Sequence, residues 1–291
     1  MDNLHKNFIL TPFNVLYKFN PELTLKLLYR LKMGQKLDLK NPKLYNEKIQ
    51  WIKLNDKNPL MPMCCDKFWV REYVKSKGLE NILIEQYWNG FDPNQIPYES
   101  LPEEFIIKVT HGSSFNIIST NKEKLNKVDV SIKINRWLKS KYLSSYGEWF
   151  YGVKKPRIIV EKLLETEDGS QLKDYKIFCF NGVPKFIRVD MNRSGNQERC
   201  IYDTHWNEMK GYEIEYKTST TKVLKPEYLN ELLIYAQTLS SDFYHARVDF
   251  YILHSKIYFG EITFTSGAGY ASIIPKEFEE KMGDWLKLPL N

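Results

Sequence analysis

Two acidic residues near the C-terminal end of the chain are spaced so that they can form a metal-binding pair. Arg247 and Asp249 lie in one apolar run, and Glu261 and Thr263 lie in the next. Side chains alternate along a strand, so Arg247 and Asp249 share a face, and hairpin pairing of the two runs would bring Glu261 beside Asp249. Adjacent carboxylates repel unless a cation compensates, and Mg²⁺ bridged to phosphate oxygens does this in phosphoryl-transfer sites. The alternative is an exposed sheet face on which Asp249 pairs with Arg247.

A possible phosphate-binding loop lies in the first half of the chain. The apolar run Phe105–Val109 contains Lys108 and leads into a turn of small residues, Gly112, Ser113 and Ser114. Backbone N–H groups and a lysine in such a turn can surround phosphate oxygens, although this is not a Walker A loop. Turns of this composition are also common in proteins without phosphate ligands.

Two further acidic and basic pairs could orient a lysine toward a ligand. Asp66 and Lys67 open an expected helix, and Asp174 and Lys176 lie on one face of an expected strand, where the carboxylate would position the ammonium group. The alternative is solvated surface charge, which is the default for a lysine in a chain with 42 Lys and Arg residues.

The elements that must position these residues can be read from apolar periodicity. Helical spacing predicts helices at residues 13–31, 46–54, 66–77, 129–141 and 226–240. Short apolar runs predict strands at residues 82–88, 105–109, 157–164, 174–180, 183–190, 245–253 and 256–265. Asn181 and Gly182 separate two of these strands and favour a two-residue hairpin turn. A helical start, a mixed middle and a strand-rich end indicate an α+β protein with nested lobes.

The first expected helix is amphipathic and basic. Its apolar residues recur at helical spacing, with Lys18, Lys26, Arg30 and Lys32 around them; they are Leu16, Phe19, Leu23, Leu27, Leu28 and Leu31. We expect this stripe to pack against its own domain. The alternative is docking on a membrane surface or a partner.

Composition limits the protein class more than the function. A chain of 291 residues with 43% hydrophobic and 27% charged residues can form an enzyme-sized globular core. Its net charge of +6 favours anionic ligands of any kind. The four cysteines have neither disulfide-framework nor zinc-site spacing, and no apolar run is long enough to span a bilayer. A cytoplasmic location is expected.

In their order along the chain, these motifs resemble those of the ATP-grasp superfamily. The motifs are Asp66-Lys67, Lys108 with its Gly-Ser loop, IIVEKLL at residues 158–164, Asp174-Tyr-Lys176, Arg247-x-Asp249 and Glu261-x-Thr263. More narrowly, three stretches resemble the TupA-like amidoligases of teichuronopeptide biosynthesis. They are KLDLKNPKLYNEKIQW at 36–51, LKDYKIFCFNG at 172–182 and IYFGEITFT at 257–265. The resemblance covers residues 36–289.

The resemblance implies an α+β ATP-grasp fold in which two lobes enclose ATP. It implies an N-terminal helical region at 1–60, a pre-grasp or linker segment at 61–104, a small lobe with the phosphate loop at 105–160, and a large lobe with the metal site at 161–291.

By the same resemblance, each motif residue receives a role. ATP phosphates would be bound by Lys67, Lys108, Lys176 and the loop Gly112, Ser113 and Ser114. Glu161 and the backbone through Leu163 would meet the adenine, and Asp168 or Glu165 the ribose. Mg²⁺ would be held by Asp249, Glu261 and Thr263, although Thr263 stands where many ATP-grasp ligases have Asn. Arg247 and Lys176 would be catalytic.

The implied activity is ADP-forming carboxylate–amine ligation through an acyl-phosphate. The expected carboxylate is a uronic acid of a bacterial surface polysaccharide or its precursor, and the expected amine is an amino acid or small amine. Arg188, Arg193 and Arg199 suit an acidic sugar, and the alternative for them is a polar hairpin surface. No nucleic acid partner is expected, whereas membrane or capsule-machinery contact through the N-terminal helix is possible.

Three other functions remain open from the sequence. A capsule-locus glycosyltransferase would need a metal site for a nucleotide sugar, and the chain has no DxD triplet. A kinase on the same scaffold would use ATP without an amine. A non-catalytic binding module would use only the basic surface.

Overall fold

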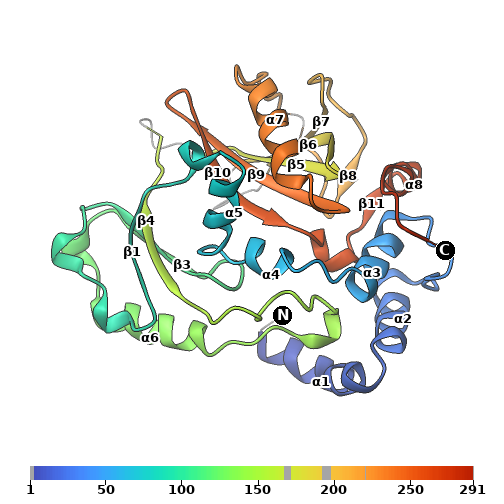
Figure 1. Ribbon diagram of the computed structural model, residues 1–291, viewed down its shortest axis with the longest axis horizontal. Coiled ribbons are helices and arrows are strands. Elements are labelled where there is room, and N and C mark those ends of the chain that lie inside the picture. The colour runs from blue at the N-terminus through green and yellow to red at the C-terminus, as the bar shows by residue number, and fades with distance from the viewer. Residues whose placement is uncertain (1–2, 167–171, 192–197, 220, 291) are drawn as a thin grey trace.

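The computed structural model describes residues 3–166, 172–191, 198–219 and 221–290. Figure 1 shows the smaller of two β-sheets at the left, the larger one at the upper right and the N-terminal helices at the lower right. The helices are α1 Asn3–Phe19, α2 Pro21–Met33, α3 Tyr45–Asn55, α4 Met61–Cys64, α5 Val70–Ser76, α6 Lys127–Leu138, α7 Leu229–Ser240 and α8 Lys276–Trp285. The strands are β1 Gln86–Gly90, β2 Phe105–Val109, β3 Asn116–Ser119, β4 Ile158–Lys162, β5 Asp174–Phe180, β6 Val183–Met191, β7 Glu198–Asp203, β8 Glu213–Ile214, β9 His245–Leu253, β10 Lys256–Thr263 and β11 Ile273–Ile274.

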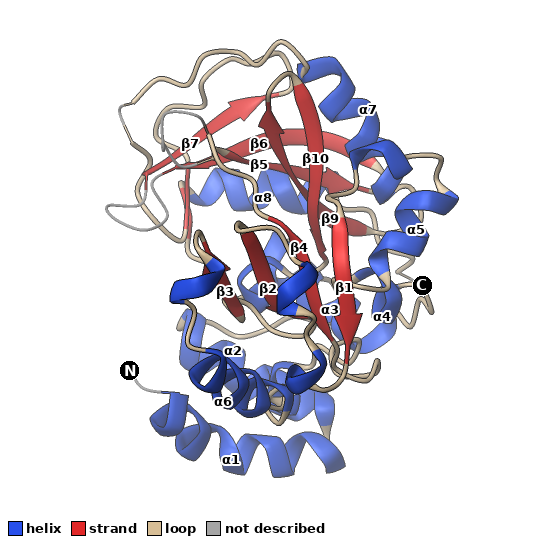
Figure 2. Ribbon diagram, turned by 90° about the vertical axis from the view of Figure 1, so that its left-hand side faces the viewer, coloured by secondary structure: helices blue, strands red, loops and turns tan. Residues whose placement is uncertain are grey.

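The smaller sheet has the antiparallel order β1-β4-β2-β3. Residues on one face of β2, among them Phe105 and Ile107, are fully buried with Ile134 of α6, and Figure 2 shows α6 beneath this sheet. Alternation therefore turns Lys108 of β2 and Glu161 of β4 to the other face.

The larger sheet has the antiparallel order β10-β9-β5-β6-β7. One face is apolar and packs on α7, with Ile177 and Val248 at its centre. The other face is divided. Its apolar part packs on α3 and α8 through Phe178 and Phe186. Its polar part holds buried charged residues of β5, β6, β7 and β9, which are Asp174, Lys176, Arg188, Asp190, Arg199, Arg247 and Asp249.

The expected α+β class is confirmed, and several strands match their predicted bounds. β2, β5 and β9 coincide with predicted strands. Asn181 and Gly182 have φ of 49° and 76°, as their hairpin turn requires. The helix expected at 66–77 begins only at Val70, because Asp66 accepts the backbone N–H groups of the turn before it. The periodicity did not reveal β3, β7, β8, β11 or α8.

The N-terminal stripe differs from expectation in two ways. The helix predicted at 13–31 is two helices, because Asn20 caps α2 and Pro21 occupies its first turn. Four residues of the predicted buried stripe are exposed to solvent: Phe19 by 83%, Leu23 by 42%, Leu27 by 40% and Leu31 by 70%. Leu28 of the stripe is buried as expected, and the other buried residues of α2 are Thr24, Leu25 and Tyr29, which lie outside the predicted stripe. Among the described residues, no helix combines the length and apolarity that crossing a bilayer requires.

Candidate active site

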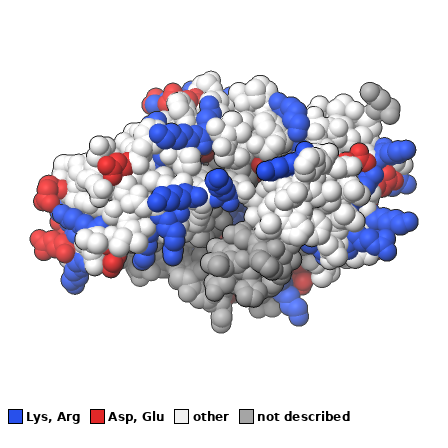
Figure 3. All heavy atoms as spheres, turned by 90° about the horizontal axis from the view of Figure 1, so that it is seen from below, with Lys and Arg blue, Asp and Glu red and all other residues white. Residues whose placement is uncertain are grey.

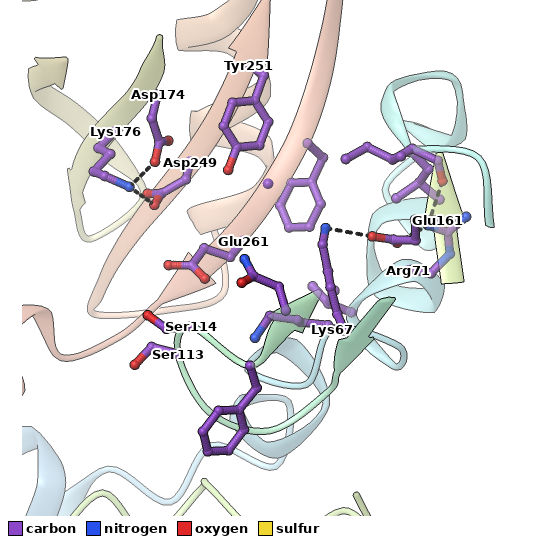
Figure 4. Close-up of a pocket in the computed structure, with 18 residues that line it drawn as sticks. Lys67, Arg71, Ser113, Ser114, Glu161, Asp174, Lys176, Asp249, Tyr251 and Glu261 are labelled. Atoms are coloured by element: carbon purple, nitrogen blue, oxygen red, sulfur yellow. Dashed lines mark hydrogen bonds and ion pairs between the residues drawn. The ribbon is translucent and has the colours of Figure 1, made fainter. Parts of the chain in front are cut away.

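A cavity of about 200 Å³ lies between the outer face of the smaller sheet and the polar part of the larger one. Figure 4 shows Lys176, Asp174 and Asp249 on one side of it and Glu161 with Arg71 on the other. Its polar lining comes from segments far apart in the chain: Lys67, Arg71, Lys108, Ser113, Ser114, Glu161, Asp174, Lys176, Asp249 and Glu261. Nine of these ten were singled out in the sequence or belong to its motifs, and Arg71 is the exception.

Asp249 and Glu261 lie opposite one another in the β9–β10 pairing. A bulge at Gly260 makes this possible, since Phe259 pairs with Phe250 and Glu261 then pairs with Asp249. A side chain at Gly260 would approach the Asp249 carbonyl oxygen to 3.0 Å. The two carboxylates therefore share one side of the sheet at the cavity.

Arg247 and Lys176 neutralise this acidic pair. The Arg247 Nη2 donates to Asp249 Oδ2 at 2.7 Å and to Glu261 Oε1 at 2.8 Å. The Lys176 Nζ donates to Asp249 Oδ2 and to Asp174 Oδ2, both at 2.6 Å. The predicted pairing of Asp174 with Lys176 is thus present. The alternative pairing of Asp249 with Arg247 also occurs, but on a buried face and not an exposed one.

The charge environment of Asp249 determines its protonation. Burial opposes ionisation of this carboxyl group, but the neighbouring Arg247 and Lys176 outweigh burial and lower its pKa to about 2. The side chain is therefore an anion throughout the physiological range.

On the opposite wall, Lys108 and Glu161 meet directly. The Lys108 Nζ donates to Glu161 Oε2 at 2.7 Å, and Arg71 Nη1 lies 3.4 Å from Glu161 Oε1. The Glu161 carboxylate thus holds two cations at the cavity edge, and Leu163 lies just beyond the end of β4, outside the cavity lining.

The glycine-serine loop joins both cavity walls. Gly112 has φ of 92°, a conformation that favours glycine, and a side chain there would collide with the Phe115 ring at 2.6 Å. The Lys67 Nζ donates to the Gly112 carbonyl oxygen at 2.9 Å, and the Gly112 N–H donates to the Tyr142 hydroxyl at 2.7 Å. Burial lowers the pKa of Lys67, although Glu261 partly offsets that effect.

The arginines expected at the substrate lie elsewhere on the polar face. Arg188 and Arg199 are buried, and both approach Asp190, with Arg188 Nε 3.0 Å and Arg199 Nε 3.5 Å from its Oδ1. Neither lines the cavity between the sheets. Arg193 and Asp168 lie outside the described residues.

A second cavity of about 340 Å³ adjoins the first. Lys67, Ser113 and Glu261 line both cavities. Arg247 and Thr263 line only the second, where the Arg247 Nη2 donates to the Thr263 hydroxyl at 3.0 Å. The Glu261 carboxylate therefore stands at the junction of the two cavities.

Sequence reasoning missed the residues that complete both cavities. Arg71, Ile84, Tyr251 and Phe259 line the first, and three more line the second, which are Tyr142, Glu148 and Tyr151. Arg71 follows Lys67 by four residues in the helix predicted at residues 66–77, a spacing that could have indicated it. The others lie in loops or on strand positions without a local signal.

The acidic pair suits Mg²⁺ bound together with phosphate. Asp249, Glu261 and Thr263 offer the hard oxygen donors that this ion prefers. Within the described ranges, no group of three or more His, Cys, Asp or Glu side chains could hold a metal ion. One or two carboxylates together with substrate phosphates are the usual protein ligands of Mg²⁺, so this donor set fits the ion.

Comparisons with known proteins place this site in a family context. A family model described as TupA-like ATP-grasp matches residues 47–287. No curated protein matches the chain. Among solved structures, the chain is similar to D-alanine–D-alanine ligase from Helicobacter pylori, with 12% identity, a TM-score of 0.47, and coverage of 86% of this chain and 68% of that one. The same enzyme from Bacillus anthracis, complexed with ATP, gives 14% identity, a TM-score of 0.47, and coverage of 77% and 65%. The chain thus spans about two thirds of each of these structures.

Proposed function

The chain belongs to the TupA-like ATP-grasp family, and from this premise we propose that it joins a uronic acid of a bacterial surface polysaccharide, or of its precursor, to an amino acid or small amine. ATP-grasp ligases bind ATP and form ADP as they couple a carboxylate to an amine. The observation that supports this function best is the junction of the two cavities at Glu261, which brings the lysine-lined first cavity next to a second one.

The residues at the junction suit phosphoryl transfer to a carboxylate. Lys67, Lys108 and Lys176 surround the first cavity and would neutralise the transferring phosphoryl group. Asp249, Glu261 and Thr263 would hold Mg²⁺, which when bound neutralises phosphate charge. The substrate carboxylate attacks the γ-phosphorus, the bond from this atom to the bridging oxygen of ADP breaks, and the products are an acyl-phosphate and ADP. Arg247, which lines the second cavity, is placed to stabilise the oxyanion formed when the amine attacks.

The glycine-serine loop would exclude water from the acyl-phosphate. Its tie to Lys67 on one side and to Tyr142 on the other links it to both cavities. Closure of such a loop limits hydrolysis of a reactive intermediate.

The uronic acid proposal is tested by an ADP-release screen. Purified protein would be incubated with ATP, Mg²⁺ and every pairing of a uronic acid panel with the amino acids. We expect ADP only when a carboxylate and an amine are both present, with an amide as product. ADP formation with the sugar alone and a stable phosphoester product would instead identify a kinase, and sugar transfer without ADP would identify a glycosyltransferase.

Lys108→Ala is expected to weaken nucleotide binding. Loss of a charge-assisted contact costs about 1.5–3 kcal/mol, or roughly a ten- to hundredfold rise in Kd. Calorimetry with a non-hydrolysable ATP analogue measures it, and Lys133→Ala, an exposed change on α6 outside the cavity lining, is the matched control. Equal affinity of the Lys108 variant and wild type would remove Lys108 from the nucleotide site.

The exposed stripe of Phe19, Leu23, Leu27 and Leu31 supports a second role, contact with an anionic lipid surface. Lys18, Arg30 and Lys32 on the same two helices are exposed as well. Apolar residues flanked by cations match the chemistry of an acidic membrane interface. Figure 3 shows several Lys and Arg side chains near the middle of the face seen from below, which is the side on which α1 lies in Figure 1.

Removing two residues of the stripe is expected to reduce vesicle binding. Phe19→Ser with Leu31→Ser should lower co-sedimentation with phosphatidylglycerol vesicles at least about tenfold, since each buried apolar side chain contributes about 1.5–3 kcal/mol. Val128→Ser with Ile132→Ser, at exposed apolar positions of α6, is the control. Equal binding by both double variants would rule out the stripe as the contact.

A further inference from the structure

The second cavity has one end that the carboxylate and nucleotide chemistry does not use. Glu148, Tyr142 and Tyr151 line this cavity and do not line the first one. Tyr142 and Tyr151 stack with ring centroids 4.4 Å apart and planes 6° apart. Glu148 accepts a hydrogen bond from the Thr265 hydroxyl, which fixes its carboxylate at this end. We name these three residues the acidic end of the second cavity.

The cations that line this cavity are Lys67 and Arg247. Lys67 also lines the first cavity, and Arg247 is bound to Glu261 at the junction. Lys53 does not line the cavity, although its charge interacts with that of Glu148, and its Nζ donates to the carbonyl oxygens of Tyr146 at 2.7 Å and Ala268 at 2.8 Å. A carboxylate substrate therefore finds its cations at the junction, whereas Glu148 is the group at the acidic end that can pair with a cation.

From this charge separation we propose that the acidic end binds the amine substrate as its ammonium ion, and that Glu148 accepts the proton that must leave before the nitrogen can attack. The proposal rests on the ligase function above and adds the place and protonation state of the second substrate. A carboxylate next to two tyrosine faces suits a primary ammonium group through ion pairing and cation–π attraction.

The proton balance of the step is complete. The ammonium group gives one proton to Glu148, and the resulting amine attacks the acyl-phosphate carbon. The C–O bond to phosphate breaks, the second proton leaves with the phosphate, and the third remains on the amide nitrogen. Glu148 then releases its proton to solvent. Burial raises the pKa of Glu148, although Lys53 and Thr265 oppose that effect, so its carboxylate accepts a proton more readily than an exposed one.

Two nucleophiles separate proton acceptance from a structural role. Hydroxylamine is largely unprotonated at neutral pH, whereas an alkyl amine is an ammonium ion. With a carboxylate that the ADP-release screen identifies, Glu148→Gln should lower the rate with the alkyl amine at least about a hundredfold and the rate of hydroxamate formation less than threefold. Glu123→Gln, an exposed change, is the matched control. An equal loss with both nucleophiles, or no loss with either, would overturn the proposal.

The affinity of the acidic end for an ammonium compound can be measured without a carboxylate substrate. Wild type in the presence of a non-hydrolysable ATP analogue would be titrated calorimetrically with ethanolamine and the amino acids. We expect at least one ammonium compound to bind, and Glu148→Gln to weaken it at least tenfold while nucleotide affinity is unchanged. Unaltered ammonium binding by the variant, or no binding by wild type, would refute the acidic end as the amine site. If wild type does not bind the ATP analogue, this result would instead count against the ligase function.

Discussion

Glu261→Gln is expected to reduce ADP formation by on the order of a hundred- to a thousandfold, because the charge at the junction of the two cavities is lost from the transition state. Glutamine keeps the size of the side chain and an oxygen that can accept from Arg247 and Thr263. The Glu261 side chain is 47% exposed, so its ion pair with Arg247 contributes little to stability. We therefore expect a large loss of turnover in a coupled ADP assay with thermal unfolding nearly unchanged.

The control for this change is a carboxylate of similar exposure outside the cavity. Glu280 on α8 is 52% exposed, and Glu280→Gln should leave both turnover and unfolding at wild-type values. Wild-type turnover in Glu261→Gln would remove Glu261 from the metal site and with it the assignment of this junction as the reaction centre.

Asp249→Asn should mainly destabilise the fold, by about 3–5 kcal/mol, because removal of one partner leaves buried charges uncompensated. Asp249 is only 1% exposed and holds both Arg247 and Lys176. Urea unfolding at neutral pH measures the effect. Asp284→Asn, an exposed change on α8, should stay within about 0.5 kcal/mol of wild type. Full stability of Asp249→Asn would contradict the buried network described above.

The same network predicts the direction of a pH effect. The folded-state pKa of Asp249 is lowered to about 2, against about 3.9 in an unfolded chain. A lowered carboxyl pKa stabilises the fold above the unfolded value, and this contribution is lost as pH falls toward the folded value. The difference in unfolding free energy between wild type and Asp249→Asn should therefore shrink as the pH falls below about 4. A difference that stays constant to pH 2 would show that charge is not its source.

Much of the polar face could be predicted because it depends on local alternation. The side chains of Asp174 and Lys176, and those of Arg247 and Asp249, are two residues apart on strands, so each pair must share a face wherever the strand lies. The strand bounds of β5 and β9 follow from short runs rich in apolar residues in which the charged residues alternate with apolar ones. The sequence alone therefore identifies the site residues of these two strands.

The face on which Glu261 lies could not be predicted from local alternation. The turn at His254 and Ser255 pairs Leu253 with Lys256, and an unbroken register from there would place Glu261 opposite Val248 on the apolar face. The bulge at Gly260 shifts it by one residue onto the face of Asp249. The polar pocket between the sheets and the packing of Gly260 against the Asp249 backbone stabilise this register.

The sequence by itself determined the family motifs, the α+β class and the faces on which the charged residues of each strand lie, because these depend on neighbours a few residues apart. Only the tertiary structure decided that the outer face of the smaller sheet lies opposite the polar part of the larger one. It also decided that Glu148 lines a cavity beside Glu261. It left Phe19, Leu23, Leu27 and Leu31 exposed. Those outcomes depend on contacts between segments that are distant in the chain, and apolar periodicity carries no information about which distant surface covers a given face.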